Sequence, residues 1–428
     1  MKNLFYLFPY LWIFSSILFF SCSEEPIPYD LSDAPLHVDS LILYNKVSGF
    51  TYQVPPEMGN LDKLYLGNDG GFINEFILLQ ISSSSYGTSL SSLLADTVTI
   101  DSAFLELIFS NDSIPNPEPP PFQLSFFTKN DSIFHENDSH NGNFSLEVLD
   151  SVLINTSSLT EAEPDSTEEI TPTLIFDVTD SMRVIADTLN SHTFLISLVD
   201  EYNGLIAFNS RESNANPKLS VYYRKFIPSE GEDKDTLILG NTFYTVKDVS
   251  IIIPPDTTLD YVSNLYVGRA LGLKSILSIN LDTLQFLPAQ TIFRTKSYLN
   301  LPYDTTLIAD KITIKAFPLA DTVDSEGYVF FSEGDPYSEH SDYDYLLETS
   351  WNTNDGFITI NIQTLLQYVH FGELNNLGIK LYSSLDNDPF KTIHFSNFNN
   401  EINPLENQTS GKGRFRASRS FSKIGKSR

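Results

Sequence analysis

The segment from Glu333 to Tyr345 concentrates the side chains best suited to bind a ligand. It holds five acids and three tyrosines, and its candidate residues are Asp335, Tyr337, Glu339, Asp342, Tyr343, Asp344 and Tyr345. Calcium prefers carboxylate and carbonyl oxygens, and tyrosine rings can stack on sugars. The segment has no Asp-x-Asp-x-Asp-Gly pattern. The two interpretations are therefore a ligand or calcium loop and a solvated acidic loop.

Arg211-Glu212 is a second polar motif, and it lies between two strand-like segments. A planar guanidinium can hold a loop against a sheet through carboxylate or backbone acceptors. The same side chain could instead meet an acidic sugar. Because the motif lies between strands of its own segment, we expect a structural role for Arg211. Its loss should lower the stability of the fold before it lowers ligand binding.

Several chemistries are excluded by what the chain lacks. His135 and His140 do not have zinc-site spacing, and there is no Gly-x-Ser-x-Gly elbow or glycine-rich phosphate loop. With 26 Lys and Arg against 55 Asp and Glu, the formal net charge is −29, which disfavours nucleic acid as a partner. We predict a protein that is not an enzyme; a polysaccharide-degrading enzyme, the weakest alternative, would need two carboxylates converging in a groove.

The N-terminus predicts export. Lys2 precedes an apolar run from Leu4 to Phe20, and Cys22, the single cysteine of the 428 residues, follows it. This resembles a bacterial lipoprotein signal with Cys22 as the lipidated residue, and Ser23-Glu24-Glu25 resembles the acidic export tags of Bacteroidetes-type surface lipoproteins. We expect a signal over 1–21, a tether over 22–38 and a lipid anchor on the outer membrane of the bacterial cell envelope, exposed at the surface. An uncleaved anchor helix is the alternative.

The sequence after the N-terminal segment contains an internal repeat. The paired segments occur in the same order in both halves: Asp39-Ser-Leu-Ile-Leu43 with Asp235-Thr-Leu-Ile-Leu239, Leu64-Tyr-Leu-Gly67 with Leu265-Tyr-Val-Gly268, 122–126 with 312–316, 174–178 with 357–362, and 206–210 with 393–397. This predicts one domain over 39–226, a linker over 227–234, a second domain over 235–410, and a basic, disordered tail over 411–428.

Period-two patterning dominates both halves. Ile312, Ile314 and Ala316 alternate with polar residues, as half-buried strands require. Helical spacing occurs once in each half, at Met182-Ile185-Ala186-Leu189 and at Ile362-Leu365-Leu366-Val369. We predict an all-β protein of two tandem, jelly-roll-like β-sandwich domains, each with a short helix; the alternative for the helical segments is continuing strand.

The first half closes with Phe176-Asp-Val-Thr179, then Phe208-Asn-Ser-Arg-Glu-Ser213 and Pro217-Lys-Leu-Ser-Val-Tyr222. This order is similar to the end of DNRLRE domains, bacterial extracellular β-sandwiches related to an alginate-binding carbohydrate module. The resemblance covers about 39–224 and implies that Asp177, Arg211 and Glu212 are motif residues. In the second half Asn361-Ile-Gln replaces Asp-Val-Thr and Asn399-Asn-Glu401 replaces the Arg-Glu pair.

These observations together predict a non-catalytic envelope lipoprotein that binds extracellular polysaccharide or another cell-surface component. The alternative is a structural spacer or adhesin subunit whose partner is a surface protein. We expect the membrane to be contacted through the lipid, and no cofactor other than calcium.

Overall fold

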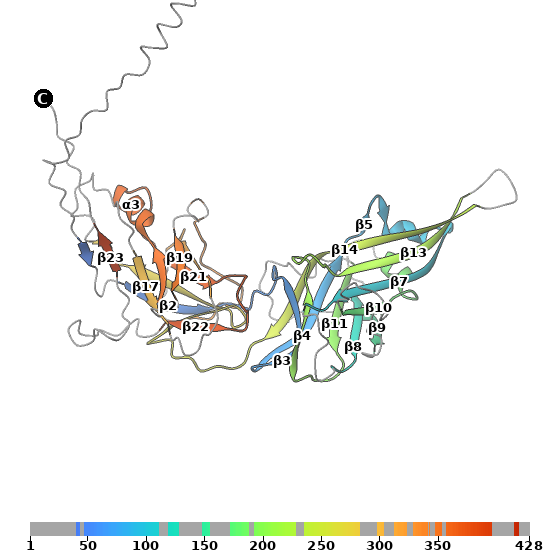
Figure 1. Cartoon of the computed structure of the whole chain (residues 1–428), viewed down its shortest axis with the longest axis horizontal. Helices are drawn as coiled ribbons and strands as arrows, with labels where there is room; N and C mark the ends of the chain where they lie inside the picture. The colour runs from blue at the N-terminus through green and yellow to red at the C-terminus, as the bar shows by residue number, and fades with distance from the viewer. Residues whose placement is uncertain are drawn as a thin grey trace, which may run out of the picture.

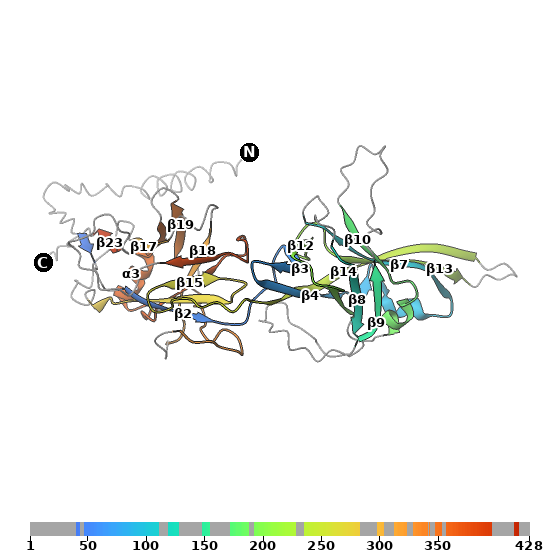
Figure 2. The same ribbon diagram turned by 90° about the horizontal axis from the view of Figure 1, so that it is seen from below.

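The computed structural model describes residues 40–42, 47–110, 119–127, 148–154, 172–187, 192–227, 235–282, 298–303, 312–322, 328–340, 342, 347–352, 357–395 and 415–418. These residues form mostly antiparallel strands with few helices, so the all-β prediction is confirmed. Two bodies lie end to end along the long axis (Figure 1) and remain so in the perpendicular view (Figure 2). We call them unit A and unit B and define each by its strands.

Unit A contains the ten-stranded sheet. Its main elements are β3 (Lys63–Asp69), β4 (Phe72–Ile81), β7 (Val98–Ile108), β8 (Phe122–Phe127), β9 (Val148–Ile154), β10 (Thr173–Asp177), α2 (Met182–Asp187), β11 (Thr193–Leu198), β12 (Gly204–Asn209), β13 (Lys218–Ile227) and β14 (Asp235–Ile253). Between β4 and β7 lie β5 (Ser84–Ser85), β6 (Thr88–Ser89) and a 3-10 helix (Leu90–Leu94).

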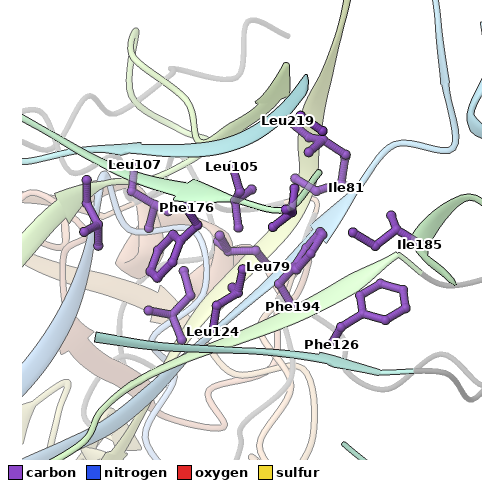
Figure 3. Close-up of a cluster of buried hydrophobic side chains, with 14 of the residues drawn as sticks. Leu79, Ile81, Leu105, Leu107, Leu124, Phe126, Phe176, Ile185, Phe194 and Leu219 are labelled. Carbon is purple, nitrogen blue, oxygen red and sulfur yellow. The ribbon is translucent and has the colours of Figure 1, made fainter. Parts of the chain in front are cut away.

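The sheet of unit A doubles back on itself because β14 is long enough to belong to two layers. Residues 235–244 of β14 pair with β13, and residues 245–253 pair with β4. The layer β10-β7-β13-β14 thereby faces the layer β14-β4-β11-β8-β9 in a sandwich-like arrangement. Figure 3 shows side chains from both layers meeting, such as Leu105 and Leu219 from one and Leu79 and Phe194 from the other.

Unit B contains a five-stranded and a six-stranded sheet. Its elements are β1 (Ser40–Ile42), β2 (Val47–Gln53), β15 (Leu265–Gly268), β16 (Leu273–Ile279), β17 (Tyr298–Pro302), β18 (Ile314–Pro318), β19 (Glu348–Asn352), β20 (Phe357–Asn361), α3 (Gln363–Phe371), β21 (Ile379–Ser383), β22 (Thr392–Phe395) and β23 (Phe415–Ser418). The alternation read from the sequence is visible in its core: Ile312, Ile314 and Ala316 are buried, whereas Lys315 is exposed.

The two units share one strand order. Unit A has β10-β7-β13-β14 in one layer, and unit B has β20-β17-β23-β1 in the corresponding positions. In the other layer, β14-β4-β11-β8 corresponds to β2-β16-β21-β18, and the pairs β3·β12 and β15·β22 also correspond. The repeated segments of the sequence occupy equivalent strands in this scheme. Helices α2 and α3 each follow the strand that the repeat predicts, β10 and β20.

The opening strand of each repeat, however, pairs within the other unit. Every residue of β2 pairs with β16, and β1 pairs with β23, so the N-terminal strands complete unit B. Conversely, β14, the first strand of the second repeat, completes unit A. The strand pairing therefore crosses the predicted boundaries at 39–226 and 235–410. The predicted linker falls between the paired ends Ile227 and Asp235 of β13 and β14.

A single hydrogen bond marks this equivalence at the level of atoms. In unit A the backbone N–H of Tyr65 donates to the hydroxyl of Ser250 on β14, with an N···O distance of 2.7 Å. In unit B the N–H of Tyr266 donates to the hydroxyl of Thr51 on β2, at 2.8 Å. Both tyrosines lie in the repeated Leu-Tyr-x-Gly segments, so β14 and β2 hold the same place in the two units.

The tail prediction needs one correction. We predicted a basic, disordered segment over 411–428, but Phe415–Ser418 forms β23, which pairs with β1 and β17. The local sequence is basic and short, and its strand character depends on partners far away in the chain. Strand β23 holds in unit B the place that β13 holds in unit A.

The units are joined by a shared apolar cluster. Phe76 and Leu78 of β4 and Val249 and Ile251 of β14 pack together with Leu271 and Leu273 of unit B. Strand β4 reads as a nearly continuous apolar run because one face lies in this cluster and the other in the core of unit A. The junction is therefore a packed interface rather than a flexible linker.

Candidate functional site

The predicted ligand loop covers a group of buried and half-buried charges in unit B, which we call the Asp335 cluster: Glu57, Arg269, Lys274, Asp335, Glu339 and Lys380. The Nζ atoms of Lys274 and Lys380 each lie 2.8 Å from Oδ2 of Asp335. Lys274 also pairs with Glu57 at 2.8 Å, and Lys380 with Glu339 at 3.1 Å. The cluster is neutral overall, with three cations against three carboxylates.

Strands on three parts of the chain position these groups. Lys274 comes from β16, Lys380 from β21, and the hydroxyl of Tyr52 on β2 donates to both carboxylate oxygens of Asp335, at 3.1 and 3.2 Å. Both lysine Nζ atoms lie 5.7 Å from the ring centroid of Tyr382. The lysines of the two neighbouring strands thus converge on one carboxylate.

The pKa shifts follow from this packing. Burial opposes the charge of Asp335, but Lys274 and Lys380 outweigh it and lower the pKa of the carboxyl. Burial also opposes the charge of Lys274, yet Glu57 and Asp335 raise its pKa. Burial, together with Asp335, raises the pKa of Tyr52, so its hydroxyl stays a hydrogen-bond donor. The groups favour one another's charged or donating forms.

Two hollows in the described part of the chain adjoin the cluster. One, of about 390 Å³ and open to solvent, lies on the loop itself and is lined by Asp335 together with 330–334 and Pro336. The other, lined by residues such as Arg269, Lys274 and Tyr382, has a volume of about 20 Å³. That is space for one water molecule. A cation would meet two ammonium groups already bound to Asp335. The two lysines bound to Asp335 therefore disfavour calcium at the Asp335 cluster.

The seven predicted loop residues are thus only partly brought together. Asp335, Tyr337 and Glu339 meet Lys380, whose Nζ donates to the carbonyl of Tyr337 at 2.9 Å. Asp342 is exposed, and Tyr343, Asp344 and Tyr345 lie outside the described residues. Among the residues that the structure describes, no group of three or more His, Cys, Asp or Glu could hold a metal ion.

The Arg211-Glu212 motif closes a loop onto β14. The backbone N–H of Arg211 donates to Oδ2 of Asp248 at 2.6 Å, and its guanidinium donates to the carbonyl of Val246 at 2.9 Å. The guanidinium also pairs with Glu212 at 2.5 Å. These contacts are with backbone and carboxylate acceptors, the kind that the structural interpretation of the motif requires.

Asp248 is the partner that the sequence analysis missed. It is 1% exposed and directly precedes the mostly apolar end of β14, residues 249–253. An acid beside such an apolar segment is itself a signal, since a buried carboxylate needs donors. Asp177, the remaining motif residue, accepts hydrogen bonds from the backbone N–H and hydroxyl of Thr179, at 3.0 and 2.5 Å.

A cleft lies between the units, which the sequence did not indicate. This inter-unit cleft has a volume of about 720 Å³ and is lined by Asn60, Asp62, Lys63, Tyr65, Asp69, Leu205, Ala207, Glu212, Leu385, Asp386, Asn387, Asp388, Pro389 and Phe390. Five of these residues are acids and one is a lysine. Because the lining residues come from segments far apart in the chain, no local sequence motif could predict the cleft.

Aromatic side chains form part of the cleft wall. The ring centroid of Phe390, from unit B, lies 5.1 Å from that of Tyr65 and 5.3 Å from that of Phe72 in unit A. Both ring pairs have edge-to-face geometry. Burial, followed by the charges of Asp62 and Asp388, raises the pKa of Tyr65. Its phenol is therefore protonated and lies near two carboxylates. The cleft thus offers carboxylate acceptors, amide groups and an aromatic wall.

Cys22, the predicted lipid attachment site, lies outside the described residues. Within the part of the chain that the structure describes, no helix has the length and apolar character needed to cross a bilayer.

Comparison with known proteins gives no relative on which to base an assignment. No family model, no curated protein and no solved structure matches this chain. The function must therefore be argued from the two units and the cleft between them.

Proposed function

We propose that this chain is a non-catalytic lipoprotein of the bacterial cell envelope, anchored to the outer membrane through Cys22, that binds extracellular polysaccharide in the inter-unit cleft. We also propose that its units are two β-sandwich modules of the DNRLRE type. The observation that carries the binding proposal is the cleft of about 720 Å³ with carboxylates, amides and aromatic rings from both units. Pockets of this size are typical of ligand sites.

The charge of the cleft selects among polysaccharides. Carboxylates accept hydrogen bonds from sugar hydroxyls. The carboxylates of a uronic-acid polymer would be repelled, because the acids of the lining outnumber Lys63 even with Glu212 paired to Arg211. The net charge of −29 repels polyanions at longer range as well. We therefore propose a neutral or amino-sugar polysaccharide as the ligand, which differs from the alginate implied by the family resemblance.

A glycan array followed by titration tests the proposal. The double variant Asp62→Asn with Asp69→Asn removes two cleft carboxylates, and Glu75→Gln with Asp256→Asn removes two exposed acids that do not line the cleft. Loss of one charge-assisted hydrogen bond corresponds to about tenfold in affinity. We expect that loss only in the cleft variant. A glycan that is shortened during incubation would contradict the non-catalytic assignment.

A second candidate function, a spacer or adhesin subunit that binds protein, is favoured by the arm formed by the ends of β13 and β14. Three large apolar side chains are exposed there: Ile227 at 39%, Leu237 at 45% and Ile238 at 79%. Exposed apolar strand edges are sites of strand addition. If Ile238→Lys abolished self-association or surface-protein binding while the glycan array stayed blank, this candidate would replace the first.

A further inference from the structure

Lys380 and Asp335 form an ion pair that the proposed binding function does not use. Their side chains are 6% and 14% exposed, and Nζ of Lys380 lies 2.8 Å from Oδ2 of Asp335. Removing two charges from water is costly, and a buried pair is weak support for stability. An amine held 2.8 Å from a carboxylate oxygen in a largely buried pair is also placed to react with that carboxyl group.

The carboxylate of Asp335 has donors arranged for a tetrahedral intermediate. Oδ1 accepts from the backbone N–H of Tyr337 at 3.0 Å and from the hydroxyl of Tyr52 at 3.1 Å. Two donors on one oxygen are the arrangement that stabilises a developing oxyanion. The other oxygen, Oδ2, is held by the ammonium of Lys274 at 2.8 Å, which favours its departure.

Glu339 supplies the base for Lys380. Its Oε1 lies 3.1 Å from Nζ, within reach for proton transfer. Lys274 is paired instead with Glu57 at 2.8 Å and remains the charged neighbour. The two lysines therefore differ in role although both touch the same oxygen.

Aromatic rings pack against one side of the group. The ring centroids of Tyr52 and Tyr337 are 4.9 Å apart, and those of Phe331 and Phe50 lie 5.6 and 6.4 Å from that of Tyr337. Tyr52 is 0% exposed. Burial of Lys380 and Tyr52 lowers the local dielectric and strengthens each of the contacts above.

We propose that Lys380 and Asp335 condense into an intramolecular isopeptide bond that ties β21 to the loop over it. The Nζ–Cγ bond forms and the Cγ–Oδ2 bond breaks. The ammonium loses two protons, which pass through Glu339 to Oδ2, and Oδ2 leaves as water while Glu339 ends unchanged. An ammonium and a carboxylate together contain every atom of the amide and the water, so the reaction needs no co-reactant.

Peptide mass spectrometry of the purified full chain is a direct test. No Lys or Arg lies between Lys315 and Lys380, so trypsin releases peptide 316–380 from an unlinked chain. In the linked chain, cleavage after Lys380 is blocked. We expect peptide 316–391, lighter than its sequence mass by one water molecule. Release of peptide 316–380 at full mass would overturn the proposal, as would a link at Lys274.

Matched variants assign the roles. Lys380→Arg and Asp335→Ala remove the reacting groups, and Glu339→Gln removes the base while keeping the size of the side chain; all three should restore the unlinked mass. Lys315→Arg, an exposed position on β18, should leave the link intact. A link that formed as fully in Glu339→Gln as in the native chain would remove Glu339 from the mechanism.

Discussion

Units A and B have the same strand order but are closed in different ways. In unit A the closing strands β13 and β14 are neighbours in the chain and pair along ten residues. In unit B the corresponding strands, β23 and β1, come from opposite ends of the chain and pair along three. The two units therefore have the same topology, but only the folding of unit B depends on strands from both ends of the chain. We expect unit B to unfold when the N-terminal strands are removed.

Deleting residues 1–54 should have the largest effect. The deletion removes the whole partner strand of β16 and the buried Phe50, Tyr52 and Val54. Because a domain is stable by only about 5–15 kcal/mol, we expect unit B to unfold. Hydrogen exchange would show unprotected β16 and β21 beside protected β4 and β11. A deletion of 1–39 is the control, and protection of β16 in the longer deletion would contradict the comparison.

Gly272→Ala should be more harmful than Gly71→Ala, its counterpart between the first two strands of unit A. Both glycines have positive φ, 66° and 87°, so alanine costs about 1–2 kcal/mol at either position. At Gly272 a Cβ would also lie 1.8 Å from the carbonyl oxygen of Val54, whereas at Gly71 the nearest atom is 3.1 Å away. Overpacking adds about 1–3 kcal/mol. An equal loss of unfolding free energy for the two variants in denaturant titrations would contradict this, and would show that the backbone at Val54 shifts readily to admit the Cβ.

Ser250→Ala and Thr51→Val test the shared hydrogen bond. Each leaves a backbone N–H, that of Tyr65 or Tyr266, without its hydroxyl acceptor. An orphaned buried donor costs about 1–3 kcal/mol. Thr51 also bonds to Ser275, so the unit B variant should be slightly more costly. Exchange rates measured separately in β3 and β15 would separate the two effects.

Arg211→Ala should have the smallest effect. The contact between Arg211 and Asp248 has no counterpart in unit B, because Gly49 occupies the position on β2 that Asp248 occupies on β14. The side chain of Arg211 is 35% exposed and donates to the carbonyl of Val246, so we expect a loss of about 0.5–1.5 kcal/mol. Arg183→Ala, exposed on α2, is the matched control. Unchanged stability with lost glycan binding would make Arg211 a ligand contact.

Much of the fold could be predicted because strands carry local signals. Alternation at Ile312–Ala316 and the repeated Leu-Tyr-x-Gly segments identified strands and their equivalence. The partner of each opening strand could not be predicted, because Asp39–Leu43 and Asp235–Leu239 have nearly the same side chains and either could complete either unit. Pairing between strands far apart in sequence depends on the whole chain.

The candidate sites show the same limit. The acidic sequence of 333–345 is compatible with binding either calcium or lysine side chains. The lysines that it does contact, Lys274 and Lys380, lie on strands outside this segment, so the segment alone could not reveal them. The motif Arg211-Glu212 could be interpreted locally, but its acceptor Asp248 belongs to the next repeat. The inter-unit cleft exists only once the two units are packed.

The route of the backbone from β2 to β3 also has a mechanical consequence. Strand β2 lies in unit B, and the chain then passes through buried Val54, Met58 and Leu61 directly into unit A. Tension between the amino end and unit A would run along this one stretch of backbone, with unit B attached at its side. Strands β1 and β2 would carry that load along their length, and the other strands of unit B would be loaded only through their pairing with them.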